Sequence, residues 1–577
     1  MERRVLLAIS LSFLVLFAYQ TYFAPPPPAP VATPNAGATA PPLPAPAGPA
    51  PANPDLPQVA VVVEEGESTE REITVETHAV RAVFTNRGAR LKHWLLKQYR
   101  SDTGEPLDLV PEAALVNNAL MPFSLRLEDQ GFTSAVNGGL FHSEAPNTVD
   151  ATAGPATISF IWRGAGGVAV RKVFTLQPDG YIVSFTASVQ RDGQDLNPIV
   201  EWGPGLGDDI AHASSGGFLA PSYSTPAQAL VHRDRSVTRL PASSAGTEAG
   251  PFSYAGIDDH YFAALALNNP ANPQPMHFEH TPFVVPPKSE GAPSGRYAAF
   301  AVGYATSPES QRFFVGPKAF DDLKAIDTEL VRVINFGIFS WLAVPLLNAL
   351  KWVHQYVGNW GWAIIALTII INLAMFPLRQ KAVSSMRKMQ EIQPQMKAIQ
   401  ERYAKYKVTD PQRQKMNEEV MALYKAKGVN PASGCIPMLL TFPFLFAFYA
   451  MLSQAIEIRG ADFFGWISDL SRPDPLYITP LLMGATMFWQ QKIAPTSADP
   501  VQQRVMMIMP VMFTTMFMWA PSGLVVYWFV SNLWAIGQQI VTTKMIGASP
   551  QRTVRPAAER RVKNAGGGKT DAAKERK

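Results

Sequence analysis

The chain of 577 residues is too long for one domain, and its near-zero mean hydropathy averages a water-soluble part with a membrane part. Its net charge of +4 is small, so the distribution of charge carries more information than the sum. The single cysteine, Cys435, excludes an internal disulfide and a cysteine-based zinc site. No nucleotide-binding, HExxH or GxSxG motif occurs, so we expect no enzyme, no metal and no cofactor.

Residues 1–23 predict an N-terminal transmembrane anchor. Arg3 and Arg4 precede an apolar run, as in a signal peptide. Cleavage after Ala24 would place the bulky Tyr22 where a signal peptidase needs a small residue, so we favour an uncleaved anchor over a removed signal. The basic end stays inside, and residue 24 onward is then outside.

Residues 24–57 contain 14 prolines and predict an extended linker, because such a segment cannot pack a core. Residues 58–325 then change to a β pattern. Apolar side chains alternate with polar ones at Ile158, Phe160 and Trp162, which favours a large antiparallel β-sandwich. The densest polar cluster, residues 258–261, fits loop structure better than chemistry, since the histidines of this region lack metal or triad spacing.

Residues 326–357 predict an amphipathic helix on the outer membrane surface. The run 333–352 is apolar but includes Gly337, Pro345 and Asn348. If it spanned the membrane, every later loop would lie on the opposite side, against the charge rule, so we place it on the surface. Aromatic side chains would anchor it at the interface: Phe336, Phe339, Trp341 and Trp352.

Residues 358–546 carry five apolar, helix-length runs. The runs are 362–378, 435–452, 476–490, 505–519 and 524–541. The connection 379–427 holds 12 Lys/Arg against 5 Asp/Glu, and the tail 547–577 holds nine Lys/Arg. Because basic loops stay in the cytoplasm, we predict six spans with both termini cytoplasmic.

Residues 379–428 predict a cytoplasmic pair of antiparallel helices. Apolar residues recur every three or four positions, among them Met386, Met389 and Met396, and Asp410 with Pro411 starts the second helix. Two interpretations remain open. The stripes pack on each other, or they form an adaptable methionine surface for varied apolar segments.

Polar residues inside the spans suggest a wet cavity open to the cytoplasm, although hydrogen bonding between helices is an equal alternative for any one of them. In the first of the five runs Thr368 and Asn372 share a face with Arg379. Spans of 15–18 residues reach only about 22–27 Å, which favours local thinning of the bilayer.

Several motifs resemble the YidC/Oxa/Alb family of membrane protein insertases in its Gram-negative form. They are Asn359-Trp-Gly-Trp362, Met375-Phe-Pro-Leu378, Asn430-Pro431, Gly434-Cys-Ile-Pro437, Met509-Pro510, Pro521-Ser-Gly-Leu524 and Val530-Ser-Asn532. The resemblance implies a polytopic α-helical membrane protein of the bacterial inner membrane, with six transmembrane helices, a five-helix insertase core and a periplasmic antiparallel β-sandwich domain.

The resemblance also implies site residues and partners. A hydrophilic groove would be lined by Thr368, Asn372, Thr441, Tyr527 and Trp528. A substrate's apolar segment would slide along Phe442, Pro443 and Phe444. The hairpin would meet nascent membrane proteins, the basic tail would touch the ribosome, and the protein would work in the lipid bilayer alone or with the Sec translocon.

One position departs from the family pattern, which usually has an arginine where this chain has Asn372. Arg379 lies about 10 Å further along the helix axis, beyond Pro377. We therefore predict that Asn372 keeps the groove hydrated and that Arg379 adds charge from below without replacing the arginine directly.

Two other function classes stay open on the sequence. A secondary transporter typically shows paired repeats, and none is found between the halves. A membrane-anchored carbohydrate-binding protein is the third possibility, because large β-sandwiches often bind sugars.

Overall fold

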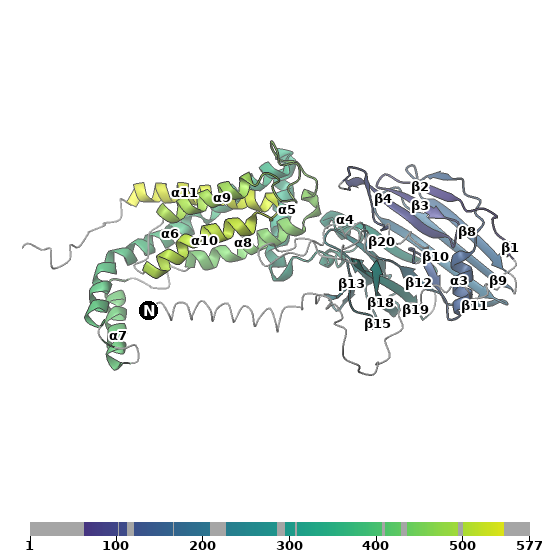
Figure 1. Cartoon of the computed structure of the whole chain (residues 1–577), viewed down its shortest axis with the longest axis horizontal. Coiled ribbons are helices and arrows are strands. Elements are labelled where there is room, and N and C mark those ends of the chain that lie inside the picture. Colours follow the sequence, from purple (N-terminus) through teal and green to yellow (C-terminus); the bar gives the residue numbers. More distant parts are fainter. Residues whose placement is uncertain are drawn as a thin grey trace, which may run out of the picture. The chain divides into compact units, whose positions relative to one another are not determined.

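The computed structural model describes residues 63–546 apart from 102, 112–119, 165–166, 208–226, 286–294, 306–307, 405, 407–409, 429–435 and 494–499. The predicted anchor (1–23), linker (24–57) and basic tail (547–577) lie outside the described residues. The chain folds as two compact units (Figure 1). Among the described residues, the β-sheet unit comprises 63–348, Ala447–Pro475 and Trp519–Gly523, and the helical unit comprises Ala349–Phe446, Leu476–Met518 and 524–546.

Three sheets build the β-sheet unit (Figure 1). The ten-stranded sheet runs in the order β1 (Val63–Glu65), β8 (Ala156–Gly164), β9 (Val168–Leu176), β10 (Ile182–Arg191), β20 (Gln311–Pro317), β17 (Phe262–Leu267), β16 (Tyr254–Asp258), β13 (Gln228–Arg233) and β14 (Ser236–Leu240), with β11 (Gln194–Leu196) paired to β10. A second sheet contains β15 (Gly246–Gly250), β18 (Met276–Val285), β19 (Gly295–Tyr304), β12 (Ile199–Trp202) and β6 (Ser124–Arg126). The third contains β5 (Pro106–Asp108), β4 (Arg90–Arg100), β3 (Val80–Thr85), β2 (Glu72–Glu76) and β7 (Thr148–Asp150).

The sheets pack through the side chains that the alternation predicted. In β8, Ile158, Phe160 and Trp162 are buried and the residues between them are not. Phe123, which precedes β6, lies 5.2 Å from Phe174 of the ten-stranded sheet, measured between ring centroids. Such pairs between sheets confirm a layered β domain. The prediction of wholly antiparallel pairing is wrong at one place, where β2 and β7 run parallel.

The β3–β4 hairpin depends on a glycine. Gly88 has φ +68°, which side chains rarely adopt, and a Cβ there would meet the Asn137 carbonyl oxygen at 2.4 Å. The turn therefore needs glycine both for its backbone conformation and for the close approach of α3 (Gln130–Gly138).

Short helices follow the last strand. They are α4 (Phe320–Ile326), η3 (Leu330–Val333), η4 (Gly337–Phe339) and α5 (Ser340–Val357). The predicted surface helix thus begins at Ser340 and not at Val333, because the chain turns at Gly337, whose φ is +62°. The anchor role predicted for Phe336 is wrong, since this side chain is buried, whereas Trp341 and Trp352 are exposed as expected.

The helical unit contains a helix at each of the five apolar runs. They are α6 (Trp360–Arg402), α8 (Ile436–Gln454), α9 (Ile478–Ile493), α10 (Pro500–Phe517) and α11 (Ser522–Ile546), and α7 (Pro411–Ala426) pairs with the end of α6. Among the described helices, two are long and apolar enough to cross a membrane, in α6 (Trp360–Gln380) and in α11 (Ser522–Met545). Shorter apolar stretches occupy Phe442–Gln454 and Met506–Phe517.

Helix α11 holds the helical unit together through contacts with three neighbours. Trp528 packs on Phe513 of α10, and Asn532 donates to the Met483 carbonyl of α9 at 3.4 Å. Thr542 Oγ1 donates to Gln380 Oε1 of α6 at 2.7 Å. Both aromatic packing and polar bonds therefore join the helices, as apolar surroundings require of polar side chains.

Candidate functional site: a polar pair in the apolar helices

A chain of hydrogen bonds runs along one face of α6. Thr368 Oγ1 donates to the Ile364 carbonyl at 2.6 Å, and Asn372 Nδ2 donates to the Thr368 carbonyl at 2.8 Å. Arg379 Nη1 then donates to Asn372 Oδ1 at 2.8 Å. Thr368 and Asn372 are both buried. The asparagine amide is thus oriented with its oxygen toward the guanidinium.

We predicted that Arg379 adds charge from below without replacing the family's arginine directly, and the structure brings its guanidinium onto Asn372 itself. The helix continues without a break through Pro377, so seven residues make almost two full turns and return to the same face. The estimate of the gap compared backbone positions, whereas a long arginine side chain tilts back toward the helix N-terminus. The Arg379 guanidinium therefore lies beside Asn372, although its backbone is about two turns further along the helix.

The two aromatic groove candidates of α11 have different neighbours. Tyr527 is buried and lies near enough to Arg379 for the two side chains to interact electrostatically. Trp528 packs instead against α10, with ring centroids 5.5 Å from Phe513 and 4.9 Å from Phe517. Consecutive helical residues point about 100° apart, so only one of the pair can face Arg379.

Sequence analysis missed two polar contacts between helices. Thr542 bonds Gln380, and Thr486 receives a bond from Asn532 at 3.4 Å. Thr542 stands four residues after Gln538, which is also buried, so helical spacing of polar residues on α11 was the available signal. For Asn532, hydrogen bonding between helices is the interpretation that the structure supports.

The proposed slide residues lie on α8. Phe442 is exposed and stacks on Phe446 at a centroid distance of 6.0 Å, while Pro443 and Phe444 are half-buried. The backbone of Thr441 belongs to α8, but its side chain lies outside the described residues. Phe446 is exposed as well, so both rings lie at the surface of α8.

The second helix of the hairpin begins at the predicted residue, and the two helices of the hairpin contact each other. Asp410 caps α7 by accepting from the Gln412 N–H, with Pro411 in the first turn. Tyr424 Oη contacts Met396 Sδ at 3.0 Å across the pair, which supports the packed interpretation for Met396. The side chains of Met386 and Met389 lie outside the described residues.

The polar cluster at residues 258–261 holds two distant parts of the β-sheet unit together. His260 Nε2 donates to the Ser453 carbonyl at 2.5 Å, and Glu457 Oε1 accepts from the Phe320 N–H at 3.2 Å. Arg459 lies over the rings of Tyr261 and Phe262. Residues 447–475, which comprise the end of α8 and the loop after it, are thereby attached to the sheets.

Acid should loosen this attachment. Burial, together with the charges of Lys318 and Arg459, lowers the pKa of His260 to about 4, although the bond to Ser453 and the Asp258 charge oppose this shift. An unfolded histidine titrates near 6.5, so the attached state is fully stable above that pH and loses at most about 3 kcal/mol as the pH falls toward 4. The protection factors of residues 455–475 against hydrogen exchange, corrected for the intrinsic rate at each pH, should therefore fall between pH 7 and pH 4.5.

Two variants make this test specific. His260→Gln keeps an N–H donor for Ser453 but cannot titrate, so the protection factors of the same residues should stay constant over this interval. His142→Gln changes an exposed histidine and should behave as the wild type. Equal protection of the wild-type segment at both pH values would show that His260 does not control it.

No group of three or more His, Cys, Asp or Glu side chains in the described part of the chain is placed to hold a metal ion. The described side chains of α6 bring polar and cationic groups together at the site. Such an arrangement can bind and hydrate a passing polar segment.

Comparisons with known proteins cover almost the whole chain. The family model described as "60Kd inner membrane protein" matches residues 352–549, and "YidC periplasmic domain" matches residues 72–349. A "Membrane protein insertase YidC" from Syntrophus aciditrophicus is 35% identical over 94% of this chain and 100% of its own length. Another, from Geobacter metallireducens, is 33% identical over 95% of this chain and 99% of its own length.

A solved structure is also similar. The crystal structure of an active YidC insertase with its first transmembrane domain resolved covers 84% of this chain and 95% of its own, at 18% identity and a TM-score of 0.34.

A β domain joined to apolar helices with a buried polar face defines a class: inner-membrane proteins with a folded periplasmic domain. Within that class, the chain belongs to the YidC family of membrane protein insertases.

Proposed function

We propose that the chain inserts and folds integral membrane proteins in the bacterial inner membrane. The observation that carries the proposal is identity of 33–35% to insertases along 94–95% of the chain, including both the β domain and the helices. The chemistry of the helical unit agrees, because it offers polar and cationic groups in apolar surroundings.

The groove is assigned to Thr368, Asn372, Thr441, Tyr527 and Trp528, with Arg379 as its cation. A polar segment that leaves water loses several kcal/mol unless it finds partners. Asn372 and Arg379 supply such partners within the apolar helices, and the guanidinium also attracts acidic residues of the substrate.

The apolar part of the substrate leaves along α8 and α10. Phe442, Pro443 and Phe444 form the start of this slide, and α10 contributes the exposed Ile508, Val511 and Met512. Helix α9 has 16 residues and spans about 24 Å, less than a hydrocarbon core of about 30 Å. The bilayer thins beside such a helix, which shortens the path of a polar segment.

The topology has six spans, with residues 1–23 as the first and both termini in the cytoplasm. The domains follow as linker 24–57, periplasmic domain 58–325, interfacial helix 326–357, core 358–546 with hairpin 379–428, and tail 547–577. The hairpin with Met386, Met389 and Met396 receives nascent chains, and the basic tail contacts the ribosome. The Sec translocon is the second protein partner.

Reconstitution of the purified full-length chain into liposomes tests the function directly. A newly synthesised one- or two-span protein is added without nucleotide, and protease protection reports insertion. We expect insertion well above that of empty liposomes, because binding in the groove replaces the hydration that the polar segment loses.

The alternatives predict other outcomes. No gain with several substrates, but a gain with added Sec translocon, would make the chain an accessory assembly factor and not an autonomous insertase. Uptake of a small solute by the same liposomes would favour a transporter.

A further inference from the structure

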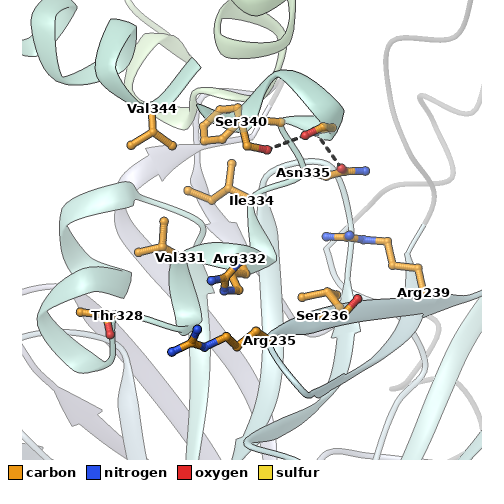
Figure 2. A pocket seen from close by; sticks show the side chains of 13 residues that line it. Arg235, Ser236, Arg239, Thr328, Val331, Arg332, Ile334, Asn335, Ser340 and Val344 are labelled. Atoms are coloured by element: carbon orange, nitrogen blue, oxygen red, sulfur yellow. Dashed lines mark hydrogen bonds between the residues drawn. The ribbon is translucent and has the colours of Figure 1, made fainter. Parts of the chain in front are cut away.

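A basic pocket lies in the β-sheet unit where the β13–β14 hairpin meets the short helices that lead to α5 (Figure 2). Its volume is about 410 Å³, within the range of small-molecule sites. Strand β14 and the turn before it contribute Arg235, Ser236 and Arg239, and the segment from η3 to α5 contributes Arg332, Asn335 and Ser340. Three arginines and no carboxylate line the pocket.

The positive charge of this pocket is only partly compensated. Arg239 Nη2 donates to Asp258 Oδ2 at 3.0 Å, but Lys318 shares the same oxygen at 3.1 Å, so one carboxylate faces two cations. Arg332 pairs with Glu329 at 2.7 Å on the surface, where such a pair is weak. Arg235 is exposed and has no ion pair within the described residues.

Hydrogen bonds connect the two walls of the pocket. Arg239 Nη2 also donates to the Val333 carbonyl at 2.6 Å, which joins β14 to η3. Ser340 Oγ donates to the Gly337 carbonyl at 2.5 Å, and the Gly337 N–H donates to Asn335 Oδ1 at 3.2 Å (Figure 2). These bonds hold the loop at the pocket mouth in one shape.

Exposed apolar side chains flank the pocket on the same segment. Ile338, next to Gly337, is 84% exposed, and Trp341, next to Ser340, is 69% exposed. Large apolar residues beside arginines are typical of a surface that meets the interface of a membrane, where the ring and the aliphatic chain enter the headgroup layer. A pocket for a free anion in water would gain nothing from these two residues.

We propose that this pocket binds the phosphate headgroup of an anionic phospholipid from the periplasmic leaflet. Arg235 and Arg332 donate to the phosphate, Ser236 and Asn335 lie within the same lining for the polar part of the headgroup, and Ile338 and Trp341 contact the acyl region. The lipid attaches the β-sheet unit to the membrane surface at the start of α5. The site does not depend on insertase activity.

The test uses the delipidated full-length chain in a neutral detergent. Dihexanoylphosphatidylglycerol, dihexanoylphosphatidylcholine and inorganic phosphate are titrated separately, and hydrogen exchange of residues 328–344 reports occupancy of this pocket and not of other lipid-facing surfaces. We expect protection with the phosphatidylglycerol at concentrations where the phosphatidylcholine has little effect, and weaker protection as salt increases.

Arginine variants assign the effect to the pocket. Arg235→Gln keeps a long side chain at a left-handed backbone position (φ +63°) and should weaken phosphatidylglycerol binding about fivefold, and Arg235→Gln with Arg332→Gln about twentyfold. The matched control, Arg171→Gln, changes an exposed arginine of β9 that does not line the pocket, and should leave binding unchanged.

Three results would overturn the proposal. Equal protection by the two lipids would remove the requirement for an anion, and unchanged binding by the double variant would place the lipid elsewhere. Protection by inorganic phosphate as strong as that by phosphatidylglycerol would make this a site for a soluble anion.

Discussion

Replacing Arg379 by methionine should reduce insertion of substrates with acidic translocated segments at least tenfold. The variant removes the cation that the structure delivers to Asn372 at 2.8 Å, within helices where charge interactions are weakly screened. Protease protection in liposomes measures the rate. For substrates whose acidic residues are changed to amides, the insertion rate should fall much less, because these substrates have no charge for the guanidinium to attract.

Exchanging the two residues distinguishes the effect of the positive charge from the effect of its position along α6. The variant with Asn372→Arg and Arg379→Asn places the cation directly at the buried position and keeps the pair, so insertion should return to within about threefold of the wild type. Asn372→Leu alone leaves Arg379 without its buried acceptor and should lower insertion as Arg379→Met does.

Lys492→Met is the matched control, since this lysine is exposed at the end of α9, outside the groove, the slide and the hairpin. If Arg379→Met inserted acidic substrates at the wild-type rate, Arg379 would not be the groove cation.

Replacing Asp258 by alanine should destabilise the β-sheet unit by about 3–5 kcal/mol, the cost of leaving buried cations without their partner. Asp258 and Lys318 are both almost inaccessible, and Arg239 is largely covered. The variant leaves Arg239 and Lys318 without their carboxylate partner, and it also weakens the link between β14 and η3. Hydrogen exchange of β13, β16 and β20 in the full-length protein measures the loss.

Two further variants define the cause. Adding Lys318→Met to Asp258→Ala removes one of the orphaned cations, so the double variant should recover part of the stability lost by the single one. Asp195→Ala changes an exposed carboxylate that accepts a bond from Gln190 and should cost less than about 1 kcal/mol. A loss no larger in Asp258→Ala than in this control would show that the cluster is not held by its charges.

Sequence periodicity predicted the local structure because it reports which side of a segment is buried. The alternation of Phe160 and Trp162 with polar residues predicted β8, and the five apolar runs each became a helix. Asp410 and Pro411 predicted the start of α7 because a cap acts on backbone groups two or three residues away. The family membership followed from short motifs spread along the chain.

Contacts between distant segments were decided by the tertiary structure. Within one helix, the reach of Arg379 to Asn372 depended on side-chain direction and on α6 remaining straight enough through Pro377, and neither follows from residue spacing. Across the chain, Asp258, Lys318 and Arg239 are brought together by strand order, and His260 meets Ser453, 193 residues away.

Tertiary packing also decides that Phe336 is buried and that three arginines line one pocket. Composition and periodicity determine which faces must be covered, but which segment covers them depends on the packing of the whole unit, because many pairs of apolar faces are compatible until shape, strand register and polar partners select one.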